Sequence, residues 1–121
     1  MIRILYVDDE EDIREVVSIA LSLDPELDVR LCDGGPAALE AAASWQPALI
    51  LLDFMMPGMD GPATLGKLRE NPRTAELPVV FVTARSAPSD VAQLMSLGAK
   101  GVIAKPFDPM ALSADVRRYL P

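Results

Sequence analysis

A run of four bulky aliphatic residues, followed directly by an aspartate, limits what this chain can fold into more than any other stretch. The run spans residues 49–52, and Asp53 follows it. A strand with one wet face alternates apolar and polar residues, so an unbroken apolar run is typical of a strand covered on both faces. Turn residues then lead to a helix predicted from Pro62. Two interpretations of Asp53 are open. It could only start this turn, or it could be a ligand-binding residue, because open α/β sheets bind their ligands at the carboxyl ends of their strands.

Strand-like and helical patterns alternate five times along the chain, without a repeat or a linker. Strands are predicted over residues 2–7, 27–32, 49–53, 79–83 and 102–104, and helices within 13–21, 36–45, 62–70, 88–97 and 109–120. This alternation predicts a doubly wound parallel α/β sheet with right-handed crossovers.

The apolar positions also predict which faces of the elements are buried. The first helix should bury one face that carries five residues: Ile13, Val16, Val17, Ala20 and Leu21. Leu27, Val29 and Leu31 alternate with other residues, which predicts a half-exposed strand at or near an edge. Asp108 and Pro109 predict the cap and first turn of the last helix.

The composition indicates one globular domain in a reducing compartment. The chain has 121 residues, of which 50% are hydrophobic and 24% charged, enough to bury a single core. We expect neither a membrane span nor a signal peptide, because the apolar runs are short and the N-terminus enters a strand directly. The single cysteine, Cys32, cannot form an internal disulfide, so a cytoplasmic location is expected.

Several classes of function are excluded by what the chain lacks and by its charge. It contains no histidine, which removes histidine acid–base catalysis and, with one cysteine, leaves no classical zinc site. The formal net charge of −7 argues against a nucleic-acid surface. If DNA is regulated downstream, we expect another polypeptide to bind it.

Four of the predicted strands end in polar side chains or are followed directly by them: Asp8 and Asp9, Asp53, Thr83, and Lys105. Because the carboxyl ends of parallel strands meet at one edge of a sheet, we expect these side chains to converge. Carboxylates at ~4 Å repel by about 4 kcal/mol per pair at an effective dielectric near 20, so compensating cations are needed. Lysine supplies one positive charge, and a hard divalent ion such as Mg²⁺ would supply the rest. Such an assembly suits phosphoryl transfer.

Each of these residues taken alone has a simpler interpretation. Asp8 and Asp9 could be helix N-caps, since acids are favourable there. Thr83 could be an ordinary strand-end hydroxyl, and Lys105 a solvated surface charge. Their joint occurrence at matching strand ends is what favours a site.

Taken together, the segments resemble the receiver domain of bacterial two-component response regulators. The matching segments cover essentially the whole chain in order: Asp8-Asp9, Asp53 with residues 56–61, Thr83-Ala84, and residues 105–107. The resemblance implies a flavodoxin-like fold, with a five-stranded parallel sheet in the order 2-1-3-4-5 and five helices. It also implies one receiver domain spanning residues 1–121.

The resemblance implies that Asp53 is the phosphoacceptor, charged from the phosphohistidine of a histidine kinase or a histidine phosphotransfer protein. Asp9, Asp53 and the backbone carbonyl of Met55 would bind Mg²⁺ directly, and Asp8 mainly through water. The domain would be a signalling switch rather than an enzyme, although it would assist its own phosphotransfer and acyl phosphate hydrolysis.

The resemblance also implies that Lys105, Thr83 and Ala84 contact oxygens of the phosphoryl group. Thr83 would be the switch residue that moves when the phosphoryl group is present. The Lys105-Pro106 bond is expected to be cis. An unknown output protein would bind the face formed by helix 88–97, strand 102–104 and helix 109–120.

Two departures from the family pattern affect the output. Val102 replaces an aromatic residue that often swings inward in receivers, and it is too small and stiff for such a motion. We therefore expect backbone and loop shifts to relay the signal. Residues 98–101 lack the acidic pair common in receivers that dimerise, and the sequence has no residues after Pro121 for an output domain, so we expect none on this chain. These features favour a stand-alone or excised receiver that is a monomer or a weak dimer.

Three other functions fit the sequence less well. An FMN-binding flavodoxin needs hydroxyl and glycine donors after the first strand, where acidic residues 8–12 would repel phosphate. A haloacid dehalogenase-type phosphatase usually needs a second acid two residues after its nucleophile, where Met55 stands. A degenerate receiver that only binds partners is disfavoured by the complete set of site residues.

Overall fold

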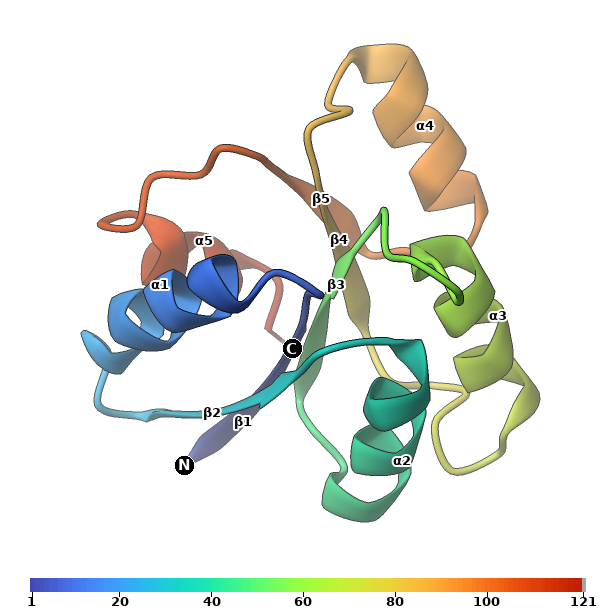
Figure 1. The fold of residues 1–121 in the computed structure, drawn as a ribbon, viewed down its shortest axis with the longest axis horizontal. Helices are drawn as coiled ribbons and strands as arrows, with labels where there is room; N and C mark the ends of the chain where they lie inside the picture. Colours follow the sequence, from blue (N-terminus) through green and yellow to red (C-terminus); the bar gives the residue numbers. More distant parts are fainter. Residues whose placement is uncertain (121) are drawn as a thin grey trace.

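Five parallel strands form the centre of the molecule, and helices cover both faces (Figure 1). The computed structural model describes residues 1–120. The strands are β1 (Ile2–Val7), β2 (Leu27–Cys32), β3 (Leu49–Asp53), β4 (Val79–Thr83) and β5 (Gly101–Ala104). The helices are α1 (Glu11–Ser22), α2 (Gly35–Trp45), α3 (Gly61–Glu70), α4 (Pro88–Ser96) and α5 (Leu112–Arg118). The strand order is β2-β1-β3-β4-β5, which confirms the predicted doubly wound sheet.

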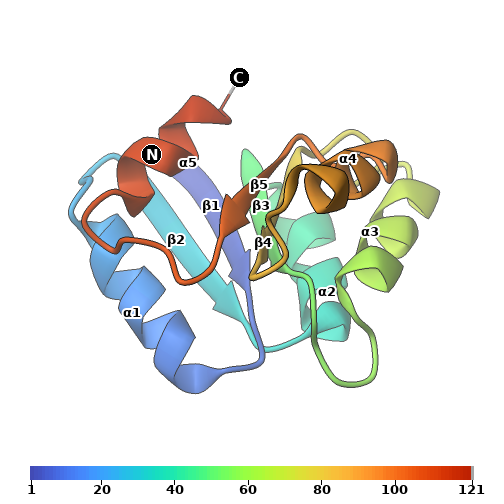
Figure 2. The ribbon, with the colours of Figure 1, turned by 90° about the horizontal axis from the view of Figure 1, so that it is seen from above.

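The strand that carries Asp53 is buried along its whole length, as its unbroken apolar sequence predicts. Ile50 and Leu52 pack into the core beneath α2, α3 and α4, whereas Leu49 and Leu51 pack into the core beneath α1 and α5. Figures 1 and 2 show these two groups of helices on opposite sides of the sheet. β3 is thereby held as the rigid central support of the site.

Two residues near the edges of the fold are more exposed than predicted. Val16 of α1 is 39% exposed, because it lines a depression in front of Phe107 instead of facing the sheet. Leu31 of the edge strand β2 is also exposed, because it lies beside the polar Glu11 and Arg14 of α1. Its neighbour Cys32 is buried in the opposite core instead.

The last helix begins later than predicted. Asp108 does accept a hydrogen bond from a backbone N–H through its side chain, but the donor is Met110, at 2.9 Å. Ala111 N also donates to Asp108 O, so these residues form a turn rather than the first helical turn. The helical hydrogen bonds start with Asp115 N donating to Ala111 O, and α5 spans Leu112–Arg118.

A tryptophan at the end of α2 ties this helix to the sheet. The guanidinium carbons of Arg3 and Arg30 lie 5.6 Å and 4.5 Å from the centroid of the Trp45 ring, within cation–π range. Arg3 Nη1 also donates to Trp45 O at 2.6 Å, and Ala48 N donates to Arg3 O. These contacts fix the chain just before β3, near the amino end of β1.

Candidate functional site

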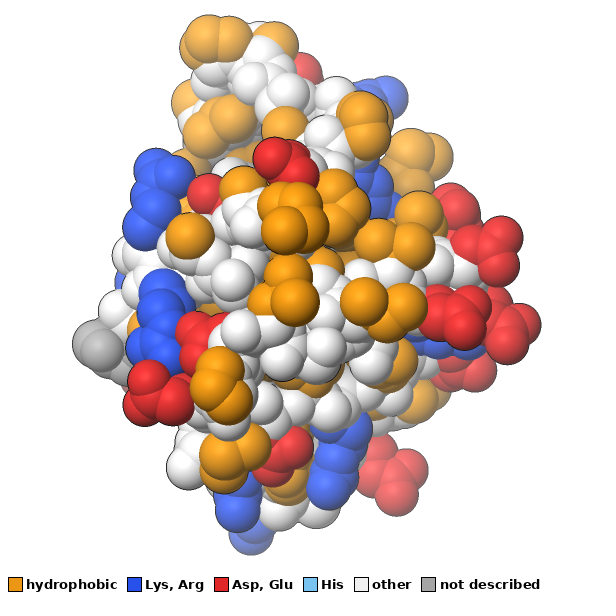
Figure 3. Space-filling model, turned by 90° about the vertical axis from the view of Figure 1, so that its left-hand side faces the viewer, with side chains coloured by type: hydrophobic (Ala, Val, Ile, Leu, Met, Phe, Trp, Pro, Cys, Tyr) orange, Lys and Arg blue, Asp and Glu red, His pale blue; other side chains and the backbone are white. Residues whose placement is uncertain are grey.

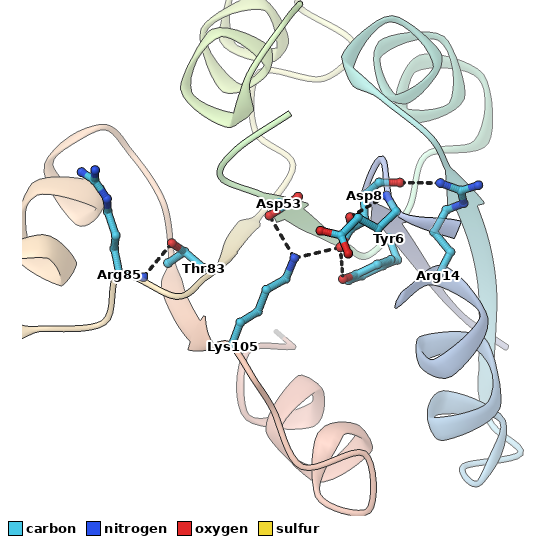
Figure 4. Close-up of polar contacts among 8 residues, drawn as sticks. Tyr6, Asp8, Arg14, Asp53, Thr83, Arg85 and Lys105 are labelled. Carbon is cyan, nitrogen blue, oxygen red and sulfur yellow. Dashed lines mark hydrogen bonds and ion pairs between the residues drawn. The ribbon is translucent and has the colours of Figure 1, made fainter. Parts of the chain in front are cut away.

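Side chains at the end of β3 and just after β1 and β5 meet at the carboxyl edge of the sheet (Figure 4). Lys105 Nζ donates to Asp8 Oδ2 at 2.9 Å and to Asp53 Oδ1 at 3.1 Å. Asp8 is fully buried and Asp53 is 5% exposed. The predicted convergence of these three side chains is therefore confirmed. The Lys105-Pro106 peptide bond is cis, as the family resemblance implied.

The acidic side chains form a cluster that fits a hard divalent cation. Asp8, Asp9 and Asp53 each offer a carboxylate oxygen, and these oxygens lie within 4.8 Å of one another. Lys105 is the cation paired with this cluster, so one positive charge faces three negative ones. Carboxylate oxygens are the ligands that Mg²⁺ prefers, and the uncompensated charge favours such an ion. The residues present therefore fit the expected metal.

The titration of the cluster reflects the same excess of negative charge. Burial, together with the charges of Asp8 and Asp9, raises the pKa of Asp53 to about 6, although Lys105 acts in the opposite direction. Burial alone would lower the pKa of Lys105, but its hydrogen bonds and the charges of Asp8 and Asp53 outweigh burial and raise it. Lys105 therefore remains charged at neutral pH, while Asp53 carries an electrostatic penalty without a metal.

Asp8 is held by three donors that the sequence pattern does not predict. Its Oδ2 accepts from the Tyr6 hydroxyl at 2.8 Å, and its Oδ1 accepts from the backbone N–H of Glu10 at 3.0 Å. Arg14 Nη1 donates to the backbone carbonyl of Asp8 at 2.8 Å. Tyr6 could have been found from its spacing, because residues two apart on a strand point to the same face.

Thr83 ends β4 beside this cluster and is buried. Its Oγ1 accepts from the backbone N–H of Arg85 at 3.0 Å, and Lys105 N donates to its carbonyl at 2.8 Å. Ala84 follows it in the exposed loop toward α4. Val102 lies on β5 opposite Phe81 and is half-buried.

The loop after β3 is closed tightly on the strand that carries Asp53. Gly61 N donates to Phe54 O at 2.9 Å, and a Cβ at position 61 would lie 2.6 Å from the carbonyl oxygen of Asp53. Asp60 caps α3 by accepting from Ala63 N at 2.9 Å, and Gly58 adopts a φ of 77° that favours glycine. Met55 lies in this loop, and its side chain is 68% exposed.

None of the helices within residues 1–120 has both the length and the apolar character needed to cross a bilayer.

Comparison with known proteins gives a consistent result. The family described as "Response regulator receiver domain" matches residues 4–117. Response regulator Rre1 of Synechocystis sp. is 41% identical over 98% of this chain, and response regulator PleD of Caulobacter vibrioides is 41% identical over 95%. This chain covers 52% of Rre1 and 25% of PleD, so it spans about half or less of these relatives.

A solved structure agrees over nearly the full length. The chemotaxis response regulator CheY4 of Vibrio cholerae superposes with a TM-score of 0.90 at 30% identity, covering 99% of each chain. The family match, the shared sheet order and the acidic edge carry the same conclusion: the chain belongs to the response regulator receiver domain family of two-component signalling.

Proposed function

We propose that this chain is a phosphorylation-dependent switch in which Asp53 accepts a phosphoryl group from the phosphohistidine of a partner. The observation that carries the proposal is the position of Asp53 at the end of the central strand, paired with Lys105 at 3.1 Å. A carboxylate oxygen of Asp53 attacks phosphorus, the new O–P bond forms, and the N–P bond to histidine breaks. The histidine nitrogen keeps the electron pair of that bond and takes up a proton.

The acidic cluster is proposed to hold Mg²⁺. Asp9, Asp53 and the backbone carbonyl of Met55 would be its direct ligands, and Asp8 would act mainly through water. Mg²⁺, when bound, neutralises the negative charge that the transferring phosphoryl group brings to the carboxylates. The uncompensated charge around Asp53, expressed in its raised pKa, supports this assignment.

Lys105, Thr83 and Ala84 would contact the phosphoryl oxygens. The ammonium of Lys105 already donates a hydrogen bond to Asp53 Oδ1, so it needs only a short movement to reach an oxygen of the attached phosphoryl group. The hydroxyl of Thr83 accepts from Arg85 N, which leaves its own proton for a phosphoryl oxygen. Movement of Thr83 would shift the loop of residues 84–87 and so alter the output face of α4, β5 and α5.

The partner that supplies the phosphoryl group would be a histidine kinase or a histidine phosphotransfer protein. A depression of about 300 Å³ beside Lys105 is lined mainly by apolar residues of α1 and of the loop after β5: Ile13, Val16, Pro106, Phe107 and Pro109. Figure 3 shows apolar side chains gathered on the side of the molecule formed by α1 and α5. Such a surface next to Lys105, which pairs with Asp53, suits a helical partner that presents its phosphohistidine to the cluster.

Phosphorylation of purified protein tests the proposal. Incubation with a small acyl phosphate and Mg²⁺ should add one phosphoryl group, detected by intact mass and mapped to Asp53. Asp53→Asn keeps the shape but lacks the attacking carboxylate oxygen, so it should fold normally and gain no phosphoryl group. Labelling of Asp53→Asn at the normal rate would overturn the assignment.

A further inference from the structure

The buried oxygen Oδ2 of Asp8 has two donors of different kinds. The neutral hydroxyl of Tyr6 lies 2.8 Å from it, and the charged Nζ of Lys105 lies 2.9 Å from it on the side toward Asp53 (Figure 4). Tyr6 and Asp8 are both fully buried. They point to the same face of the chain at the end of β1, so the strand itself sets the distance between the hydroxyl and the carboxylate.

The two donors differ in what they can do during signalling. Lys105 also bonds Asp53 and would turn to the phosphoryl group after transfer, which takes it away from Asp8. Tyr6 belongs to the buried core on the α1 side of the sheet, together with Ile4 and Leu51. The phenol of Tyr6 is neutral at physiological pH, so its hydroxyl keeps its proton and stays a donor to Asp8 Oδ2.

We propose that Tyr6 is a positioning residue whose hydroxyl holds Asp8 Oδ2 while Lys105 leaves that oxygen for the phosphoryl group. A buried carboxylate oxygen without a donor is costly, so without Tyr6 the pair of Lys105 and Asp8 would resist separation. Tyr6 also fixes the orientation of Asp8 toward the cation, as outer hydrogen bonds do for metal ligands. This inference rests on the proposed role of Lys105 at the phosphorylated site.

The first measurement is Mg²⁺ affinity by calorimetry on three proteins. Tyr6→Phe removes only the hydroxyl and should weaken binding about tenfold, because Lys105 is then the remaining side-chain donor on Asp8 Oδ2 within residues 1–120 and leaves it less readily. Tyr119→Phe is the matched control. It removes the other tyrosine hydroxyl, which donates to Val102 O at 3.3 Å away from the cluster, and its affinity should stay within about twofold of the parent value. Equal affinities for Tyr6→Phe and the parent would overturn the inference.

The second measurement separates positioning from simple core packing. Thermal midpoints without metal are compared for Tyr6→Phe in the parent and in a Lys105→Met background. With Lys105 absent, Tyr6 is the remaining side-chain donor on Oδ2, so loss of its hydroxyl should lower the midpoint more than in the parent. Equal losses in both backgrounds would mean that Tyr6 acts only through packing, and would overturn the inference.

A third measurement uses the unaltered protein, in case Tyr6→Phe does not fold. The carbon-13 resonance of the Tyr6 ring carbon that bears the hydroxyl should keep its hydrogen-bonded shift on addition of Mg²⁺ and acyl phosphate. A move to the shift of a free phenol would overturn the proposal. If the parent protein accepts no phosphoryl group at all, the proposed function fails. The thermal midpoints without metal still measure the coupling of Tyr6 to Lys105 in that case, so the two failures are distinguishable.

Discussion

At the scale of single residues, the acidic cluster brings together carboxylates that repel one another, which disfavours the ionised form of Asp53. Asp53 is surrounded by Asp8 and Asp9 and is compensated by one lysine, and its pKa is raised to about 6 as a result. A carboxylate that is costly without a cation gains most when a cation binds. The excess negative charge that penalises Asp53 without a cation would therefore favour the proposed binding of Mg²⁺.

The raised pKa of Asp53 predicts a particular pH dependence of stability without metal. In the pH range between its usual pKa of 3.8 and about 6, the folded state binds the proton more tightly than the unfolded state. The free energy of unfolding should therefore fall as pH rises through this range, by on the order of 2 kcal/mol. Lys105, whose pKa is raised from a basic value, contributes no change there.

Chemical denaturation in a chelating buffer at pH 4 and pH 7.5 measures this effect. Asp53→Asn lacks the titrating group, so it should be more stable than the parent at pH 7.5, with the difference shrinking toward pH 4. Saturating Mg²⁺ should remove the advantage of Asp53→Asn. A parent protein that gains stability between pH 4 and pH 6 relative to Asp53→Asn would contradict the assignment.

Asp9 is exposed, whereas the other two acids of the cluster, Asp8 and Asp53, are buried, so its removal separates metal binding from folding. Asp9→Ala takes away a proposed direct ligand and should weaken Mg²⁺ binding by more than about tenfold. Because the charge of Asp9 raises the pKa of Asp53, its loss should leave metal-free stability unchanged or higher. Calorimetric titration and a thermal melt without metal give the two values. A large loss of metal-free stability with unchanged affinity would argue against a ligand role.

At the scale of elements, the start of α3 is packed against the strand end that carries Asp53. Gly61→Ala would place its Cβ 2.6 Å from Asp53 O and 2.9 Å from Phe54 Cα, and backbone atoms cannot turn aside as a flexible side chain can. We expect a loss of about 1–3 kcal/mol in the free energy of unfolding. Phosphorylation should slow as well, because the strand end is displaced.

Gly66 is a control for that substitution, since it lies in the same helix with nothing within 4 Å of a built Cβ. Gly66→Ala should therefore stabilise the protein by up to about 1 kcal/mol through helix propensity alone. Urea denaturation compares the two variants. Equal changes in stability for the two variants would show that contact with the Asp53 strand end does not exclude a side chain at position 61.

The loop between β4 and α4 is the element that we expect to transmit the signal. Thr83→Ala should still accept phosphate but should lose most of the phosphorylation-dependent change in α4, because it lacks the hydroxyl. Val102→Ala should leave phosphorylation nearly intact and change the response only modestly, since no aromatic ring moves at this position. Amide exchange with and without acyl phosphate compares the two variants. An equal loss of response in both would make Val102 itself the relay.

At the scale of the whole molecule, the parts predicted from the sequence are those set by local patterns. The apolar run before Asp53 and the strand-helix alternation are enough to place the carboxylates and Lys105 at one edge, because parallel strands share their direction. The exposure of Val16 and Leu31 was not predictable from spacing, since it depends on which side chains of other elements lie beside them.

The contact of Tyr6 and the start of α5 were missed for a different reason. Any bulky apolar residue would satisfy the strand pattern at position 6, and only its nearness to Asp8 gives the hydroxyl a partner. At Asp108 the sequence allows either a helix cap or a turn, and hydrogen bonds to both Met110 and Ala111 select the turn.

The contact of Trp45 with Arg3 and Arg30 provides a way to measure unfolding of this protein in solution. Trp45 is the chain's single indole fluorophore, and it lies near the amino end of β1, whereas the carboxylates lie beyond the opposite strand ends. Its emission should change when the sheet comes apart and α2 separates from Arg3 and Arg30. It should be nearly silent to Mg²⁺ and to phosphorylation. Trp45 fluorescence should therefore report whether the protein is folded, and should not report whether Asp53 is phosphorylated.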